Sequence, residues 1–520
     1  MTAVPPDLRA AATMGDKAPA RPSRAGRAHL AASVLLAAAV LAVLLPFAGA
    51  DPPTGLTGSN APFTDEGFNL ANARNRVLFG RFGVDDVDRS LTNGAYSTAA
   101  AAVFRVTGPR LAVGRALSMA CTAAAVLLLA QGLARPFGRP AALLAAVALG
   151  GADLALEYGR LGLVEPMVVA LLTAAFVVVV RSRPRPSVPA GALAGLLVAA
   201  AVSVKATALL PGVVLLGVPL APALWERTRL GAALAGPVAA AAAGLAWLSA
   251  VALPNADRLR TALRIWPSVH YPHSPGALAA RLGAYLAHSD QALGRSAPLL
   301  AAAGTGLVAA AAGWRSLDPS RREALVMAAG WGIGLWAAIA VGDYAPNRYV
   351  VPALPGLAVL AGFGLAAVAG AASRAMPRGR RPGVAAAAVA VLLGLAVAGP
   401  GAARFLAGSD PGASQRVRDQ RALAAAAGPD ATVYGAYAPT LLFDTRLRVV
   451  EPWPPAHANL RDPVGRFGVT HVLAGGPGDP TRQVPAFRGA GRLVPVARVP
   501  WAGQAVWLYE VRTGTAGTPG

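Results

Sequence analysis

The chain contains 520 residues, of which 55% are hydrophobic and 14% are charged, and its mean hydropathy is +0.49. These values exclude an ordinary soluble globular protein and indicate a polytopic membrane protein. The net charge of +22 does not indicate nucleic-acid binding, because most arginines stand in short segments between apolar runs, where membrane topology favours positive charge. The single cysteine, Cys121, excludes a disulfide framework and a cysteine-based metal site.

About eleven apolar runs are long enough to cross the roughly 30 Å hydrocarbon core of a bilayer. They cover residues 29–50, 111–133, 139–156, 163–180, 188–204, 206–223, 231–253, 297–314, 324–342, 349–371 and 383–400. The third and fifth runs are short or interrupted by glycine, so either can form a re-entrant segment instead of a span. The predicted fold class is mainly α, with about eleven transmembrane helices in a membrane domain over 29–400 and further helices in its external loops.

Arginine-rich loops determine the predicted orientation. If the tail 1–28 is cytoplasmic, the loops ARPFGRP, RSRPRP, WERTRL, RSLDPSRRE and RAMPRGRRP all lie on the cytoplasmic side, in agreement with the positive-inside rule. The two long loops, 51–110 and 254–297, then lie outside the cell. The first apolar run is longer than the core of a usual signal peptide, which favours an uncleaved helix. The sequence thus predicts a multi-pass cell-membrane protein with a disordered cytoplasmic N-terminal tail.

The pattern changes after the last apolar run. The segments ATVYGAY, LRVVE, GVTHVLAGG, GRLVPVARV and QAVWLYEVR are typical of short strands, and APTLLFD is typical of a helix between the first two. We therefore expect a small extracytoplasmic α/β domain over 401–520.

Two adjacent acids, Asp65 and Glu66, follow the first apolar run in the stretch APFTDEGFNLANARNRVLFGRF. Thr64 is suited to cap a helix that begins with these acids, where backbone N–H groups and the helix dipole favour negative charge. Phe68 and Ala71 then lie on one side, as expected for a helix in the plane of the membrane interface. On local sequence alone, helix capping is a sufficient role for both acids.

Isolated charges stand at other ends of the apolar runs. Lys205 and Arg348 are each the single basic residue of a short external loop, and each is a candidate for a binding role. The alternative for Lys205 is a lysine that snorkels from a helix end to the membrane surface. The alternative for Arg348 is an anchor to lipid headgroups. Glu165 precedes Pro166 at a helix start, so it is either a capping residue or a second active-site acid. Arg160 is expected to pair with either Glu157 or Glu165.

Two further segments contain residues of the types that bind substrates or cations. His270 and Tyr271, in the loop sequence VHYPH, are candidates for contact with an acceptor, or in the case of Tyr271 for an aromatic belt at the membrane surface. The D-x-D pattern in 85–88 is better explained as a solvated acidic loop than as a cation site, because no other hard ligands are evident nearby. No metal and no cofactor is predicted.

The first helix, the external Asp-Glu pair and the following FNLANARNRVLFGRF resemble the glycosyltransferase C superfamily, in the family 39 branch of protein O-mannosyltransferases and aminoarabinose transferases. The segments EYGRLGLVEPMVV, GLLVAAAVSVKATALLP and DYAPNRYVVPALPGLAVLAG follow in the same order. The resemblance implies transfer of a sugar from a polyprenyl-phosphate carrier to an acceptor at the outer face, with inversion. It also implies that Asp65 is the catalytic carboxylate, with Glu66 beside it.

Elementary chemistry agrees with this reading. Displacing a lipid phosphate from an anomeric carbon needs a base for the acceptor hydroxyl, and positive charge to stabilise the departing phosphate. Lys205 and Arg348 are the candidates for that phosphate, whereas the acceptor, a glycan, lipid or protein, is not specified. A ligase or polymerase of surface polysaccharide, or a transporter or flippase of lipid-linked sugar, remains as an alternative; a transporter would place its charges near the bilayer midplane.

Overall fold

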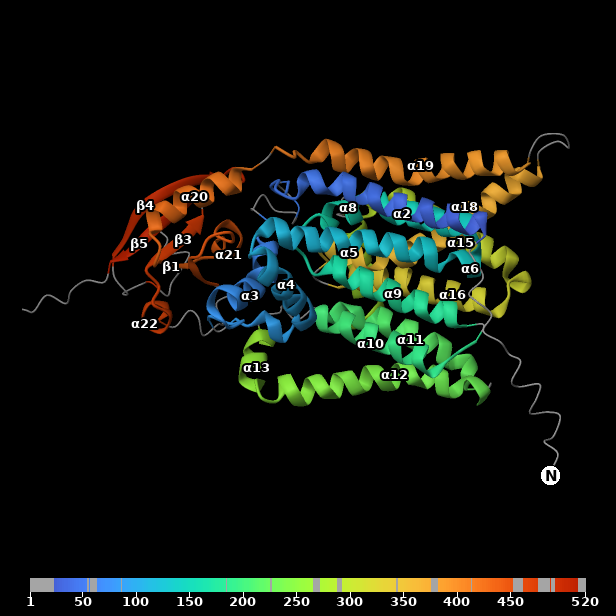
Figure 1. The fold of residues 1–520 in the computed structure, drawn as a ribbon, viewed down its shortest axis with the longest axis horizontal. Helices are drawn as coiled ribbons and strands as arrows, with labels where there is room; N and C mark the ends of the chain where they lie inside the picture. The colour runs from blue at the N-terminus through green and yellow to red at the C-terminus, as the bar shows by residue number, and fades with distance from the viewer. Residues whose placement is uncertain are drawn as a thin grey trace, which may run out of the picture.

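A computed structural model gives the arrangement of the chain (Figure 1). It describes residues 23–53, 56, 63–85, 87–183, 185–224, 227–264, 272–287, 292–342, 345–375, 382–412, 414–451, 462–475, 487 and 492–512. Long helices run side by side in a bundle, and a small sheet with its own helices lies beyond one end of the bundle.

The described residues form the following elements, in which η marks 3-10 helices except η4 and η6, which are π-helical. The helices are α2 (Arg24–Leu44), η1 (Leu45–Phe47), α3 (Asp65–Phe79), η2 (Arg89–Leu91), α4 (Gly94–Thr107), α5 (Leu111–Gly132), α6 (Ala134–Phe137), α7 (Arg139–Gly150), α8 (Asp153–Gly159), α9 (Glu165–Ser182), α10 (Val188–Val204), η3 (Ala206–Ala208), α11 (Leu209–Ala223), α12 (Arg227–Trp247), η4 (Leu248–Ala252), α13 (Ala256–Arg264), α14 (Pro275–Ala287), α15 (Ala292–Gly313), η5 (Trp314–Ser316), α16 (Pro319–Ala329), η6 (Gly330–Gly334), α17 (Leu335–Ala340), η7 (Asn347–Ala353), α18 (Leu354–Arg374), α19 (Pro382–Gly408), α20 (Gln415–Ala427), α21 (Ala438–Leu441) and α22 (Pro463–Phe467). The strands are β1 (Thr432–Tyr434), β2 (Arg448–Val450), β3 (His471–Gly475), β4 (Arg492–Trp501) and β5 (Gln504–Arg512).

All eleven predicted apolar runs fall on helices. Within the described ranges, nine helical segments are long and apolar enough to cross a membrane, or ten if the bent pair α7 and α8 counts as one span. The two remaining runs are the two that the sequence marked as irregular: α7 and α8 meet at 58°, and α10 has only 17 residues. The bend follows Gly150 and Gly151, where α19 passes so close that a Cβ at Gly151 would overlap Ala398.

Small residues allow the helices of the bundle to approach closely. A Cβ at Gly195 of α10 would overlap the backbone of Gly236 in α12, and a Cβ at Gly306 of α15 would overlap the backbone of Leu360 in α18. Such contacts are typical of membrane helices, whose association depends on van der Waals packing because lipid is as apolar as their side chains.

The five strands form one sheet in the order β2-β1-β3-β5-β4. β1 pairs in parallel with β2 and β3, whereas β5 pairs antiparallel with β3 and β4. The tight β4–β5 turn contains Ala502 and Gly503, both at positive φ. All five predicted strands and the helix between the first two are present. We refer to Gln415–Arg512 as the C-terminal unit.

Helix α3 lies between the bundle and the C-terminal unit (Figure 1). Asn72, Arg74 and Asn75 on α3 are buried. Arg74 donates to the carbonyls of Phe443 and Thr445 in the C-terminal unit, more than 350 positions away along the chain. Asn72 instead donates to the Phe82 carbonyl and to Asp88 Oδ1. That α3 lies in the plane of the membrane interface stays a prediction.

Candidate functional site

Four charged residues that the sequence marked along the chain come together at the end of the bundle that carries the C-terminal unit. Asp65 is the first residue of α3, Glu165 is the first residue of α9, Lys205 follows the last residue of α10, and Arg348 lies in η7. Each charge therefore stands at a helix end or a helix break. We call these four residues the charge cluster.

Lys205 and Glu165 form the buried part of the cluster. The Lys205 Nζ donates to Glu165 Oε1 at 2.5 Å, and it also lies 3.7 Å from the centre of the Tyr349 ring. The sequence positions Lys205 here because the backbone leaves the α-helical conformation at that residue, between α10 and η3. Such a break in an apolar bundle directs a long cationic side chain inward to a partner.

Arg348 joins the two acids of the cluster. Its Nη1 forms an ion pair with Asp65 Oδ2, and its Nε lies 3.8 Å from Glu165 Oε1. The Asp65 and Arg348 side chains are 24% and 15% exposed, whereas those of Glu165 and Lys205 are almost fully buried. The cluster therefore has a buried pair and a partly accessible pair. Within the part of the chain that the structure describes, Glu165 Oε2 has no hydrogen-bond partner, so an acceptor position remains open there.

Glu66 does not join the charge cluster, although it follows Asp65 directly. Arg115 donates to both of its oxygens, at 2.7 and 2.8 Å, and the Gly162 amide donates to Oε1 at 2.8 Å. Burial opposes ionisation of Glu66, but Arg115 and Gly162 outweigh it and hold the pKa of this carboxyl below its usual range. Glu66 is thus a fixed anion that anchors α3 to the bundle.

Arg160 belongs to a second group of ion pairs. Its Nη2 lies 3.2 Å from Glu157 Oε1, which is the glutamate partner other than Glu165 that the sequence allowed. Asp153 on the same helix α8 accepts two hydrogen bonds from Arg295, at 2.6 and 2.9 Å. This group ties α8 to α15, and Arg404 of α19 also lies 3.7 Å from Asp153.

The loop residues His270 and Tyr271 and the acidic loop 85–88 are the remaining segments that the sequence analysis singled out. His270 and Tyr271 lie outside the described residues. In the acidic loop, Asp85 Oδ2 accepts from the Glu451 amide at 2.8 Å and Asp88 Oδ1 accepts from the Ser90 amide at 3.0 Å, so both act in loop structure. Among the described His, Cys, Asp and Glu side chains, no group of three or more is arranged to hold a metal ion.

Sequence reasoning overlooked Arg115, the partner of Glu66. The signal was present, because Arg115 is a charge inside the apolar run 111–133 and such a residue needs a buried partner. The same argument would have found Asp153, at the bend of the third run. It would not have found Thr440, a neutral residue of the C-terminal unit that contacts the start of α3.

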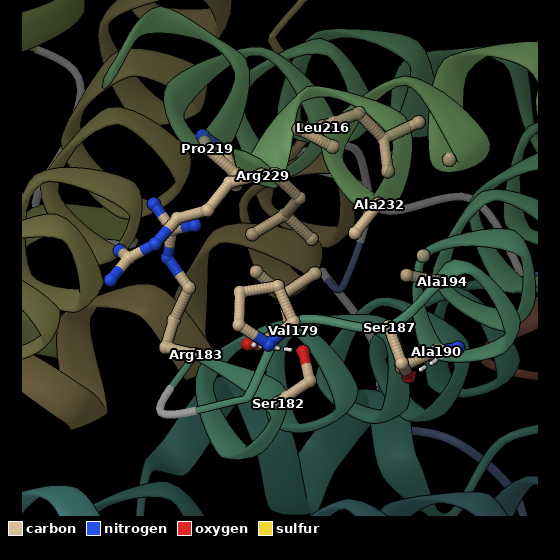
Figure 2. A pocket seen from close by; sticks show the side chains of 15 residues that line it. Val179, Ser182, Arg183, Ser187, Ala190, Ala194, Leu216, Pro219, Arg229 and Ala232 are labelled. Carbon is tan, nitrogen blue, oxygen red and sulfur yellow. Dashed lines mark hydrogen bonds between the residues drawn. The ribbon is translucent and has the colours of Figure 1, made fainter. Parts of the chain in front are cut away.

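A pocket also opens where α9 ends and α10 begins, and α11 and α12 complete its wall (Figure 2). Its lining includes Ser182, Arg183 and Ser187. Because α9 has 18 residues and rises about 1.5 Å per residue, this pocket lies roughly 27 Å along the helix from Glu165. It is therefore separate from the charge cluster, and Arg183 forms an ion pair with Glu323 there.

No protein-family model matches the sequence, and no curated protein matches it. The solved structure of ArnT from Cupriavidus metallidurans in the apo state resembles the chain with a TM-score of 0.64 and 18% identity, over 91% of this chain and 97% of that one. The structure of the same ArnT bound to undecaprenyl phosphate resembles it with a TM-score of 0.63 and 16% identity, over the same shares.

A third likeness is to the archaeal oligosaccharyltransferase AglB from Archaeoglobus fulgidus, solved with an inhibitory peptide and a dolichol-phosphate. Its TM-score is 0.52 and its identity 11%, over 94% of this chain and 75% of that one. Together with the many apolar helices, these likenesses confirm the predicted architecture. The chain is a polytopic helical membrane protein that shares the fold of ArnT and has a small C-terminal sheet.

Proposed function

We propose that the protein is a membrane glycosyltransferase that moves a sugar from a polyprenyl-phosphate carrier to an acceptor hydroxyl group at the extracytoplasmic face. The observation that carries the proposal is the charge cluster, in which two cations and two carboxylates meet at one end of a membrane bundle. The fold supports it, because ArnT has been solved with undecaprenyl phosphate and AglB with a dolichol-phosphate.

The two cations suit a lipid phosphate. Lys205 presents a compact charge next to the Tyr349 ring, and Arg348 presents a planar guanidinium, so the two groups can contact different oxygens of one phosphate. A charge-assisted hydrogen bond of this kind is worth about 1.5–3 kcal/mol. Both cations bind the phosphate more strongly as the glycosidic bond breaks, because the departing phosphate then gains negative charge.

Asp65 is the proposed base. In the transfer step, the acceptor oxygen attacks the anomeric carbon and gives its proton to Asp65. The bond from that carbon to the phosphate oxygen breaks, and its electron pair leaves with the lipid phosphate. Attack from the side opposite the phosphate inverts the anomeric centre. Asp65 is one of the two accessible members of the charge cluster, as this role requires.

Arg348 links the base to the donor. Its guanidinium forms an ion pair with Asp65. A lipid phosphate that binds Arg348 competes with Asp65 for this cation, which places the donor next to the proposed base. Glu165 holds Lys205 in place from the buried side, and its open oxygen Oε2 is available to a hydroxyl group of the bound sugar.

The test is incubation of the purified protein with polyprenyl-phosphate hexoses and pentoses and with candidate acceptors from the membrane fraction. We expect release of free polyprenyl phosphate, accompanied by transfer of the sugar, and no release by the Asp65→Asn variant. The same donors are offered in proteoliposomes. Movement of intact donor across the bilayer without release of lipid phosphate would show a flippase and contradict the proposal.

A further inference from the structure

The start of α3 is capped by a residue of the C-terminal unit. Thr64 stands at the N-cap position, but its side chain makes no capping hydrogen bond. Instead, Thr440 Oγ1 accepts from the Gly67 amide at 3.0 Å and donates to the Thr64 carbonyl at 2.6 Å. The Gly67 amide is one of the donors that a helix start leaves without a partner inside the helix. A hydroxyl group 373 positions away thus takes the place of the local cap.

The approach of the two segments is close and specific. A Cβ at Gly67 would overlap the backbone of Pro439 and Thr440, so only glycine at this position lets α21 reach the helix. Farther along α3, the buried Arg74 donates to the carbonyls of Phe443 and Leu447 at 2.8 and 2.7 Å. The segment 438–447 therefore holds α3 at its first turn and again near its middle.

The bundle also holds the first turn of α3. Glu66 binds Arg115 and the Gly162 amide, as described above. The atoms that Thr440 contacts, the Thr64 carbonyl and the Gly67 amide, flank Asp65 and Glu66 on both sides along the chain. Asp65 is thus carried by a helical turn that is fixed to the bundle through Glu66 and to the C-terminal unit through Thr440.

The geometry points to Thr440 as a positioning residue for Asp65: the C-terminal unit completes the candidate active site by fixing the helix turn that presents the proposed base. This inference rests on the proposed function. Thr440 is 1% exposed and contacts backbone atoms of α3, so it acts through the helix and does not touch the substrates.

The expected effect follows from the demands of proton transfer. A base must lie within hydrogen-bond reach of the proton that it takes, and misplacement by about 1 Å can lower the rate by about a hundredfold. Removing the Thr440 hydroxyl leaves the Gly67 amide without a partner and lets the first turn of α3 fray. Binding of the donor should change little, because Lys205, Glu165 and Tyr349 lie on other elements.

The experiment compares Thr440→Val, which keeps the shape and removes the hydroxyl group, with Thr440→Ser, which keeps the hydroxyl group. Thr470→Val is the matched control. The Thr470 hydroxyl accepts from the Thr432 amide at 3.1 Å inside the C-terminal unit, so this variant weakens the unit without touching α3. For each purified variant, kcat and KM for a polyprenyl-phosphate sugar are measured per folded molecule, together with hydrogen exchange of peptides that contain Gly67.

We expect Thr440→Val to lower kcat about tenfold to a hundredfold with KM for the donor near the wild-type value, and to speed exchange at the start of α3 at least tenfold. Thr440→Ser should restore both quantities to within about threefold, and Thr470→Val should leave them unchanged. Unaltered exchange in Thr440→Val would overturn the contact. Faster exchange with wild-type kcat, or an equal loss of kcat in Thr470→Val, would overturn its positioning role.

The two proposals fail in different ways. If the wild-type protein releases no lipid phosphate from any donor, the proposed function fails, while the exchange of Gly67 peptides still reports whether Thr440 fixes the start of α3. If the wild type transfers sugar and Thr440→Val does so at the wild-type rate, the proposed function stands and the inference about Thr440 is wrong.

Discussion

Lys205 Nζ lies 2.5 Å from Glu165 Oε1, and this buried pair joins the break after α10 to the start of α9. Breaking one partner of a buried ion pair leaves an uncompensated charge, which costs about 3–5 kcal/mol. The pair therefore keeps a cation near the end of the bundle that carries the C-terminal unit, where a free lysine would turn toward water. A lipid phosphate that binds Lys205 has to share it with Glu165.

Asp65→Asn should abolish transfer while the protein remains folded and binds donor. The amide keeps the size of the side chain and removes its ability to take a proton. We expect a loss of more than about a hundredfold in kcat, measured as lipid phosphate released per folded molecule. Activity within about threefold of wild type, a barrier change below roughly 1 kcal/mol, would rule out a base role.

Lys205→Met and Arg348→Gln should each lower donor affinity or turnover about tenfold to a hundredfold, since each removes one charge-assisted contact to the phosphate. The double variant should lose less than the product of the two effects if both residues serve one phosphate. Arg498→Met, which removes an exposed cation on β4, is the control. Donor titration of detergent-purified protein gives the values. Poor expression with wild-type affinity and turnover in both single variants would instead indicate a role in membrane anchoring.

Glu66→Gln should act on stability more than on chemistry. The substitution neutralises a buried carboxylate whose partner Arg115 is also buried, so the guanidinium loses its counter-charge. We expect a clear fall in Tm with turnover per folded molecule within about threefold of wild type. Thermal unfolding in detergent, paired with the transfer assay on the same sample, separates the two effects. An unchanged Tm with lost turnover would place Glu66 in the reaction.

The contact between the acidic loop and the C-terminal unit should weaken as pH rises. Glu451 is buried 3.5 Å from Arg89; its burial and the nearby Asp85 and Asp88 outweigh Arg89 and raise the pKa of Glu451 from 4.5 to about 8. Between pH 4.5 and 8 the unfolded chain releases this proton while the folded chain keeps it, so the free energy of unfolding falls with rising pH.

Glu451→Gln should remove this part of the pH dependence, because the amide does not titrate. Tm measured at pH 5, 6.5 and 8 should fall less steeply in Glu451→Gln than in wild type. Asp430→Asn, at an exposed carboxylate before β1, is the control and should keep the wild-type slope. Equal slopes in wild type and Glu451→Gln would contradict the expectation.

The orientation can be tested with single cysteines in a Cys121→Ser background. Ser274→Cys, before α14, should react with an impermeant thiol reagent in intact cells, whereas Ser316→Cys, at the end of η5, should react only after the cells are opened. Both serines are exposed, so access to the reagent reports the side of the membrane. Labelling of the Ser316 variant from outside would reverse the orientation that the arginines predict.

Local sequence patterns predict the segments of the fold. Each apolar run became a helix, the two irregular runs became the bent pair and the short α10, and all five strands formed where alternation predicted them. These features depend on hydrophobicity and periodicity over about 5 to 20 neighbouring residues, which are local properties. The same local analysis marked Glu165, Lys205 and Arg348, because a charge at the end of an apolar run is conspicuous wherever its partner lies, and it marked Asp65 as one of two adjacent acids.

Which charges form pairs depends on how the helices and the C-terminal unit pack. Asp65 and Glu66 are neighbours, but successive residues of a helix point about 100° apart, so one reaches Arg348 and the other Arg115. Likewise, Thr64 looked like the cap of α3, whereas Thr440 makes the capping hydrogen bonds. Whether two such residues become partners depends on the packing of segments that are tens to hundreds of residues apart in the sequence. The local sequence pattern around either residue does not contain that information.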